Sequence, residues 1–185
     1  VILYNNIVPS TTERWFANCS NLTEIANMSY LNTSNVTTMT NMFENCSNLI
    51  NLDVRNFDTS SVTNMVSMFS GCSKLTSLNV RNFDTSNVTN MNAMFRNCSG
   101  LSNLDLSSFN TKNTTSLTTT FYGCTKLKTI LVSSQWSTDK VDTYSGNLTF
   151  SNCTSLVGGK GTKYDSNHTD VTYAHIDEGI ENPGY

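Results

Sequence analysis

Charge, proline and histidine are all scarce in this sequence. Charged residues make up 14% of the 185-residue chain, against about 25% in a typical domain, and there are only 2 Pro and 2 His. The formal net charge is -3 and no basic run occurs, so no nucleic-acid partner is expected. No stretch approaches the roughly 20 apolar residues of a membrane span, so no membrane insertion is expected within this chain. The start lacks a basic-then-apolar signal segment, as in a mature piece of a longer protein or in a protein that is not secreted.

Small polar residues dominate the composition instead. Asn, Thr and Ser together account for 77 of the 185 residues, about two-fifths of the chain. Hydrophobic residues at 37% and aromatic residues at 10% are too many for a disordered polar chain, because this much apolar surface can form a core. The length is that of one domain, so we expect a single ordered domain.

The cysteines indicate a repeat, because every Cys stands in the local pattern Phe-x-x-Cys. Successive cysteines are separated by 27, 26, 26, 26 and 29 residues. A fixed period between about 20 and 50 residues is typical of solenoids and related arrays. The six cysteines are Cys19, Cys46, Cys72, Cys98, Cys124 and Cys153.

The first half of each unit has the pattern of a short strand. In the unit that begins at Cys72, the apolar residues are Leu75, Leu78 and Val80, and the last two alternate with polar residues. This period of two is typical of a strand with one buried face. Stacked coils would pair equivalent strands in parallel, roughly 4.8 Å apart.

The second half of each unit has a helical spacing. Val88, Met91, Met94 and Phe95 follow the pattern i, i+3, i+6, i+7, which lies on one face of a short helix. Before this segment stand Asn, Asp, Thr and Ser, which can accept hydrogen bonds as N-caps. We interpret the threonine of each unit as part of the cap and not as an ice-binding ladder, because one Thr per coil builds no flat array. These threonines are Thr33, Thr59, Thr85, Thr111 and Thr138.

The residue immediately before each cysteine is always Asn or Gly. These two residue types best tolerate the left-handed backbone conformation that ends a helix. The sequence therefore predicts φ > 0 at all six positions, as a requirement of the fold and not as a binding site. The positions are Asn18, Asn45, Gly71, Asn97, Gly123 and Asn152.

An even number of cysteines would suit a disulfide framework, but these six occupy equivalent positions in consecutive coils. They should therefore stack in a column, where pairing would require alternate neighbours to rotate out of the packed row. We predict free, buried cysteines that fill the core. Metal ligation needs a second Cys or a His close by, and redox chemistry needs an exposed thiol, so neither is expected.

The repeat resembles that of BspA-like bacterial surface proteins, which is also found in mycoplasma surface lipoproteins. The similarity is carried by residues 75–91 and by the motif Met-Phe-x-[Asn/Gly]-Cys-Ser, and it covers about residues 10–157. The resemblance implies a leucine-rich-repeat-type solenoid outside a bacterial cell, with adhesion as the associated activity. It implies no catalytic residues.

The predicted fold class is thus an α/β solenoid: a leucine-rich-repeat-like right-handed coil of about six strand-turn-short helix units of about 26 residues. Residues 1–157 form the solenoid, of which 1–15 are an N-terminal cap or remnant, and residues 158–185 form a C-terminal capping segment. The fifth unit departs from the pattern at residues 135–141 and is three residues longer than its neighbours. A uniform binding surface is not expected there.

A ligand is expected on the exposed strand face, because solenoids commonly bind on the extended surface that repeated columns build. Arg55 and Arg81, beside Asp53 and Asp105, are the most distinctive exposed residues, since charge is scarce elsewhere. The alternative is that these positions are polar only because they face solvent and that repetition has copied them. The candidate ligand-binding residues are Asn51, Asp53, Arg55, Ser77, Asn79, Arg81, Asn103 and Asp105.

Other motifs are weaker candidates. Asp165, His168, Asp170, His175 and Asp177 could form a metal site, but their spacing matches no known ligand set and a capping hairpin fits this segment better. The Gly-rich run at 158–162 lacks the full phosphate-loop spacing and is expected to be a turn. Catalysis by Ser or Cys needs a His nearby, and both His lie in the tail. We therefore expect neither an enzyme nor a cofactor nor a metal.

The functional prediction is a non-enzymatic interaction module on a bacterial cell surface or secreted from the cell. It would act as an adhesin, as a monomer, and bind a protein or glycoprotein on host or bacterial surfaces through the strand face. The alternative is a structural spacer that displays another domain of a longer surface protein.

Overall fold

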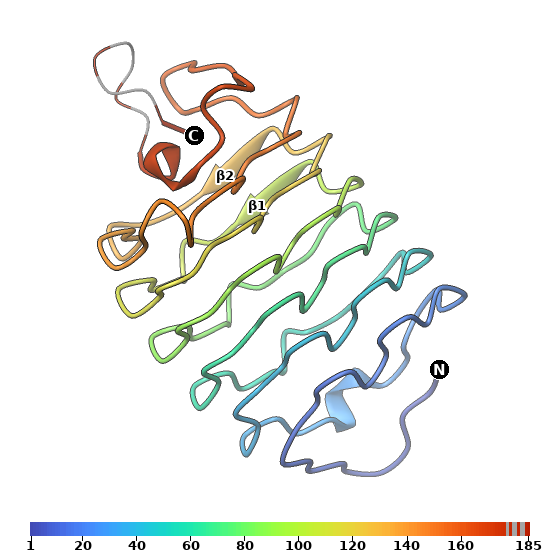
Figure 1. The fold of residues 1–185 in the computed structure, drawn as a ribbon. Coiled ribbons are helices and arrows are strands. Elements are labelled where there is room, and N and C mark those ends of the chain that lie inside the picture. Colours follow the sequence, from blue (N-terminus) through green and yellow to red (C-terminus); the bar gives the residue numbers. More distant parts are fainter. Residues whose placement is uncertain (177, 179–180, 182–183) are drawn as a thin grey trace.

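The chain is described by a computed structural model at residues 1–176, 178, 181 and 184–185. It winds through a stack of coils from the N-terminal to the C-terminal end (Figure 1). Within the described residues, regular elements are few and short. They are the 3-10 helices η1 (Met28–Tyr30) and η2 (Val171–Tyr173) and the strands β1 (Asn103–Asp105) and β2 (Thr129–Leu131). None of the helices found in this part of the chain is long and apolar enough to cross a membrane.

The two strands lie side by side in neighbouring coils. β1 pairs with β2 in parallel, with Asn103 opposite Thr129 and Asp105 opposite Leu131. The register therefore equals one repeat, as the sequence predicts for stacked strands. A repeat fold is thus confirmed, but the full strand-turn-helix unit is not.

The predicted short helices are wrong, because each segment contains two residues with left-handed backbone. Ser67 has φ 53° and Gly71 has φ 75°, and the next coil repeats this at Ala93 and Asn97 with φ 55° and 56°. A left-handed residue cannot continue a right-handed helix. The segment is instead a ribbon of tight turns, which also brings every third residue to the interior.

The ribbon divides its backbone N–H groups between two kinds of partner. The N–H of Phe69 donates to the carbonyl of Met94 in the next coil over 2.9 Å, whereas that of Met68 donates within the turn to Met65 over 3.3 Å. This alternation continues along the segment, so that every second residue is bonded to the neighbouring coil. The ribbon is therefore the side on which the coils are joined most continuously.

The prediction of φ > 0 is confirmed at all six Asn and Gly positions before the cysteines, with values from 56° to 75°. The choice between Asn and Gly also has a reason in neighbouring coils. A Cβ at Gly71 would lie 2.5 Å from Oδ1 of Asn45, and one at Gly123 would lie 2.2 Å from Oδ1 of Asn97. A side chain at Gly71 or Gly123 would therefore meet the Asn amide of the preceding coil. Asn45 avoids this conflict by donating to Oδ1 of Asn18 over 2.9 Å.

The threonine column makes bonds between coils instead of helix caps. The hydroxyl of Thr59 is buried, donates to the carbonyl of Asp84 over 2.9 Å, and accepts from the N–H of Asp84 over 2.8 Å. The same pair of bonds forms at Thr33, Thr85 and Thr111. One buried hydroxyl therefore satisfies both backbone groups of a residue in the next coil, and the capping interpretation was wrong.

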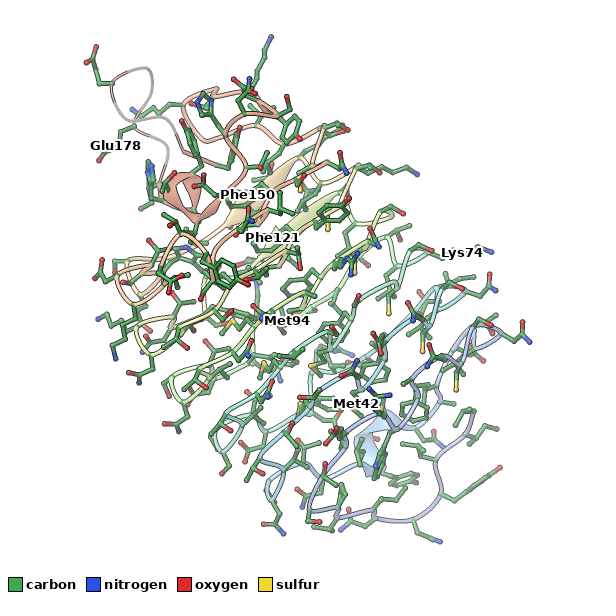
Figure 2. All side chains as sticks on the ribbon, in the orientation of Figure 1. Met42, Lys74, Met94, Phe121, Phe150 and Glu178 are labelled. Carbon is green, nitrogen blue, oxygen red and sulfur yellow. The ribbon has the colours of Figure 1, made fainter. Side chains whose placement is uncertain are left out.

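The core is built from columns of identical side chains. In Figure 2, Met42, Met94, Phe121 and Phe150 lie inside the stack, whereas Lys74 extends outward. The phenylalanines before the cysteines stack on one another at 5.5 to 5.8 Å between ring centroids, with interplanar angles of 10° or less. Offset stacking of this kind adds about 0.5–1.5 kcal/mol per pair to the burial of the rings.

All six cysteines are free, and five of them are buried, as predicted. The exception is Cys19, which is exposed. Each buried thiol donates to the carbonyl of a Phe in the preceding coil, as Cys72 does to Phe43 over 3.1 Å. Burial raises the pKa of Cys46 to about 11 and that of Cys153 to about 12, so these thiols stay protonated at neutral pH.

Segments outside the regular repeat cover both ends of the stack. At the N-terminal end, Leu3 donates its N–H to the carbonyl of Ala26 over 3.1 Å. At the other end, Tyr185 packs edge-on against Phe150 with ring centroids 5.3 Å apart. Gly146 leaves room for Val171, since a Cβ there would lie 2.3 Å from that side chain.

Candidate ligand-binding groove

The structure places all eight predicted site residues on the same side of the stack. Seven are exposed and Asp105 is half-buried. They line two hollows of about 320 and 420 Å³, which share Ser77 and Asn79. A third hollow of about 470 Å³ shares Asp53 and Arg55 with the first. We call these three continuous hollows the strand-face groove.

In its central part the groove lies between coils whose backbones are not bonded to each other, whereas the strands β1 and β2 pair at its C-terminal end. Between residues 51–55 and 77–81, all of which the structure describes, no backbone hydrogen bond forms. The ribbon on the other side of each coil holds the coils together instead. Leu52 consequently remains half-buried although its equivalents Leu78 and Leu104 are buried.

One column of the groove owes its residue type to the backbone. Oδ1 of Asp53 accepts from the N–H of Arg55, and Asn79 and Asp105 accept in the same way from the residue two positions later, over 3.0 to 3.2 Å. Asp and Asn form such turns readily. These turns give Asp and Asn in this column a structural role that needs no ligand.

The two arginines have different carboxylate partners. Arg55 binds Asp53 of its own coil through two bonds, from Nε to Oδ1 over 2.9 Å and from Nη2 to Oδ2 over 2.8 Å. The side-chain hydrogen bonds from Arg55, followed by the bond from its backbone N–H, lower the pKa of Asp53 to about 2. Arg81 has Asn79 in the equivalent position and binds Asp105 of the next coil instead, over 2.6 Å from Nε.

The groove therefore carries two ion pairs and no net charge from these four residues. Hydrogen bonds from Ser107, and then from Arg81, hold the pKa of Asp105 below its usual range. The arginine side chains are still 69% and 68% exposed, so they remain accessible to a ligand. Exposed pairs of this kind contribute little to stability, typically about 0–1 kcal/mol.

Two further sets of groove residues are not among the eight candidates. The apolar ones are Leu78, Leu104 and Leu131, of which Leu131 is 52% exposed. The other is Asn56, whose amide donates to the carbonyls of Met28 and Leu31 in the preceding coil over 3.1 and 2.9 Å. The recurrence of Asn56 and Asn82 one repeat apart was the available signal, because Asn82 makes the equivalent pair of bonds to Val54 and Phe57.

The sequence matches the model of the family described as "Mycoplasma protein of unknown function, DUF285", over residues 10–136 and 75–173. The chain belongs to this family. The resemblance to BspA-like surface proteins, which include those of mycoplasmas, is thereby confirmed. No curated protein matches the chain.

A solved structure similar to this family member is that of a leucine-rich cell surface protein from Faecalibacterium prausnitzii A2-165. The two chains are 21% identical, with a TM-score of 0.47, over 83% of this chain and 42% of the other. The present chain thus spans less than half the length of that protein.

The candidate metal residues of the tail do not form a cluster in the described part of the chain. His168 pairs with Asp165 over 3.1 Å, and Asp170 accepts from the N–H of Thr172 at the start of η2. Nδ1 of His175 lies 3.0 Å from the carbonyl oxygen of Ile176. Asp177 lies outside the described residues.

Proposed function

We propose that this chain is a non-enzymatic interaction module of an extracellular bacterial surface protein. It forms a leucine-rich-type solenoid and binds a protein or glycoprotein on host or bacterial surfaces along the strand-face groove, as an adhesin does. The observation that carries this proposal is the continuity of the groove, in which hollows from successive coils join and are lined by all eight polar residues of the repeated columns.

Binding along such a groove sums many modest contacts. Asn, Ser and Arg side chains offer hydrogen-bond donors and acceptors without net charge, and the exposed face of Leu131 offers apolar contact. Each contact is weak alone, but several along one ligand, or several copies of the chain on one cell, give high avidity. The stacked core and the threonine column keep the groove residues in fixed positions, which limits the conformational entropy lost on binding.

The second candidate function is a spacer that displays another domain. It is favoured by the turn geometry of Asp53, Asn79 and Asp105, because this column needs no ligand to explain its residue types. A spacer requires only that the coils stay folded. It therefore predicts that the groove tolerates substitution without loss of function.

The test is binding of the purified chain to immobilised host matrix proteins and to whole cells at physiological salt. The variant Arg55→Ala/Arg81→Ala removes both guanidinium groups from the groove. The matched control Lys74→Ala/Lys126→Ala removes the same charge from two exposed positions outside it. The proposal predicts saturable binding that the arginine variant loses and the lysine variant keeps. Binding to no member of the panel, or equal loss in both variants, would contradict it.

A further inference from the structure

A second cavity lies where the repeat is broken. The spacing between Cys124 and Cys153 is 29 residues instead of 26, and the irregular segment after Val132 is the place where the sequence departs most from the pattern. A cavity of about 740 Å³ opens at this point, between the segment 132–140 and the C-terminal residues 174–176. It shares no residue with the strand-face groove.

Trp136 occupies the place of a buried core phenylalanine. In regular coils the N–H of the phenylalanine at this place donates to the carbonyl of the residue three positions earlier, as that of Phe109 does to Leu106 over 2.9 Å. Trp136 makes the same bond to Ser133 over 3.0 Å, one position later than a strict repeat would place it. Phe109 is fully buried, whereas Trp136 is only half-buried and lines the cavity.

The indole ring is held in one orientation by the tail. Its Nε1 donates to the carbonyl of Ala174 over 2.9 Å. The polar end of the ring is thereby satisfied by protein, and the rest of the ring forms part of the cavity wall together with Val132 and Ile176. A fixed aromatic surface loses little conformational freedom when a ligand stacks on it.

The remaining wall is rich in hydroxyl groups and balanced in charge. Ser133, Ser134, Ser137 and Thr138 line it, as do Lys112 and Lys140. Nζ of Lys140 already donates to Oδ1 of Asn113 over 2.8 Å. The lining carboxylates of Asp139 and Glu178 offset the two lysines. The cavity therefore has neither the cationic field that selects a phosphate nor the continuous apolar wall that selects a lipid.

We propose that this cavity binds a saccharide. A pyranose ring has an apolar face of C–H groups and an edge of hydroxyls that both donate and accept hydrogen bonds. The aromatic surface of Trp136 matches the apolar face of the sugar. The serine hydroxyls and the Lys112 ammonium match its hydroxyl edge. Concave sites that combine apolar walls with a few polar groups are the usual form of small-ligand sites. The proposal does not depend on the strand-face groove.

The intrinsic fluorescence of Trp136 provides a direct assay. Trp15 and Trp136 are the only two tryptophans, and Trp15 is replaced by Phe so that Trp136 alone reports. The probes are lactose, chitobiose and sialyllactose, each up to about 10 mM, which exceeds the Kd of a weak complex. We expect a saturable change in fluorescence with at least one probe. Sialyllactose carries a carboxylate, whereas lactose and chitobiose are neutral. Binding of sialyllactose alone would indicate recognition of the carboxylate, and binding of the neutral probes would indicate recognition of the sugar ring.

Variants show whether the probe enters this cavity. Ser134→Arg places a large side chain into the cavity from an exposed position and should weaken binding by about tenfold or more. Ser166→Arg makes the same change at an exposed position outside the cavity and should not affect binding. If Ser134→Arg does not fold, protection of Trp136 from acrylamide quenching by the bound probe gives the same answer. Absence of saturable change with all three probes, or full binding by folded Ser134→Arg, would overturn the proposal.

Discussion

The buried hydroxyl of Thr59 should contribute measurably to stability through its two bonds to the next coil. Replacing Thr59 by Val keeps the shape of the side chain but removes both the donor to the Asp84 carbonyl and the acceptor of the Asp84 N–H. Thr59 is 1% exposed, so water cannot easily replace the hydroxyl. An unsatisfied buried backbone group costs about 1–3 kcal/mol, and we therefore expect a loss of about 2 kcal/mol in the free energy of unfolding.

The assay is urea unfolding followed by circular dichroism, with the free energy taken from linear extrapolation. Thr63→Val is the matched control, because the Thr63 hydroxyl bonds to the preceding coil over 3.3 Å but is exposed. Its replacement should change stability by less than about 0.5 kcal/mol. Equal stability of Thr59→Val and the wild type would refute the role of the threonine column as a link between coils.

Three further outcomes are expected. Gly71→Ala should destabilise the chain by about 1–3 kcal/mol in the same assay, because φ is 75° and the new Cβ meets Asn45; an unchanged unfolding midpoint would contradict this. Cys19 should react with Ellman's reagent in the native protein while the buried thiols react only after denaturation, and fast reaction of all six thiols would disprove the buried column. Because the pKa of Asp53 is lowered to about 2, its contribution to stability is present above the usual value of 3.8 and is lost as pH falls toward 2. Arg55→Gln should raise that pKa in an NMR titration, and no change would exclude the ion pair.

The sequence predicts the positions of residues better than the bonds they make. The columns at Cys, at the preceding Asn or Gly, and at the apolar strand positions follow directly from the period. The structure places them as expected except for the exposed Cys19 and the half-buried Leu52. The short helices were wrong because tight turns and a helix both bring every third residue inward. Ser67 and Ala93, the residues with left-handed backbone that exclude a helix, belong to types that give no signal of that conformation.

The candidate site was predictable to a similar degree. The alternation of the strand segment is sufficient to place all eight residues on one face. The separate partners of Arg55 and Arg81 depend on whether Asp or Asn stands two residues earlier. The central part of the groove depends on the lack of backbone bonds between residues 51–55 and 77–81. The cavity beside Trp136 arises from a departure from the repeat, which periodicity alone cannot describe.

The most direct test of the proposed function is to block the strand-face groove at its centre. Ser77 is exposed and lines both central hollows, so Ser77→Arg fills the groove without removing a buried contact. Thr125→Arg, at another exposed position outside the groove, is the control. Binding to host matrix proteins and whole cells should be lost in Ser77→Arg and kept in Thr125→Arg, with both proteins folded by circular dichroism. Undiminished binding by Ser77→Arg would contradict a role of the groove in adhesion.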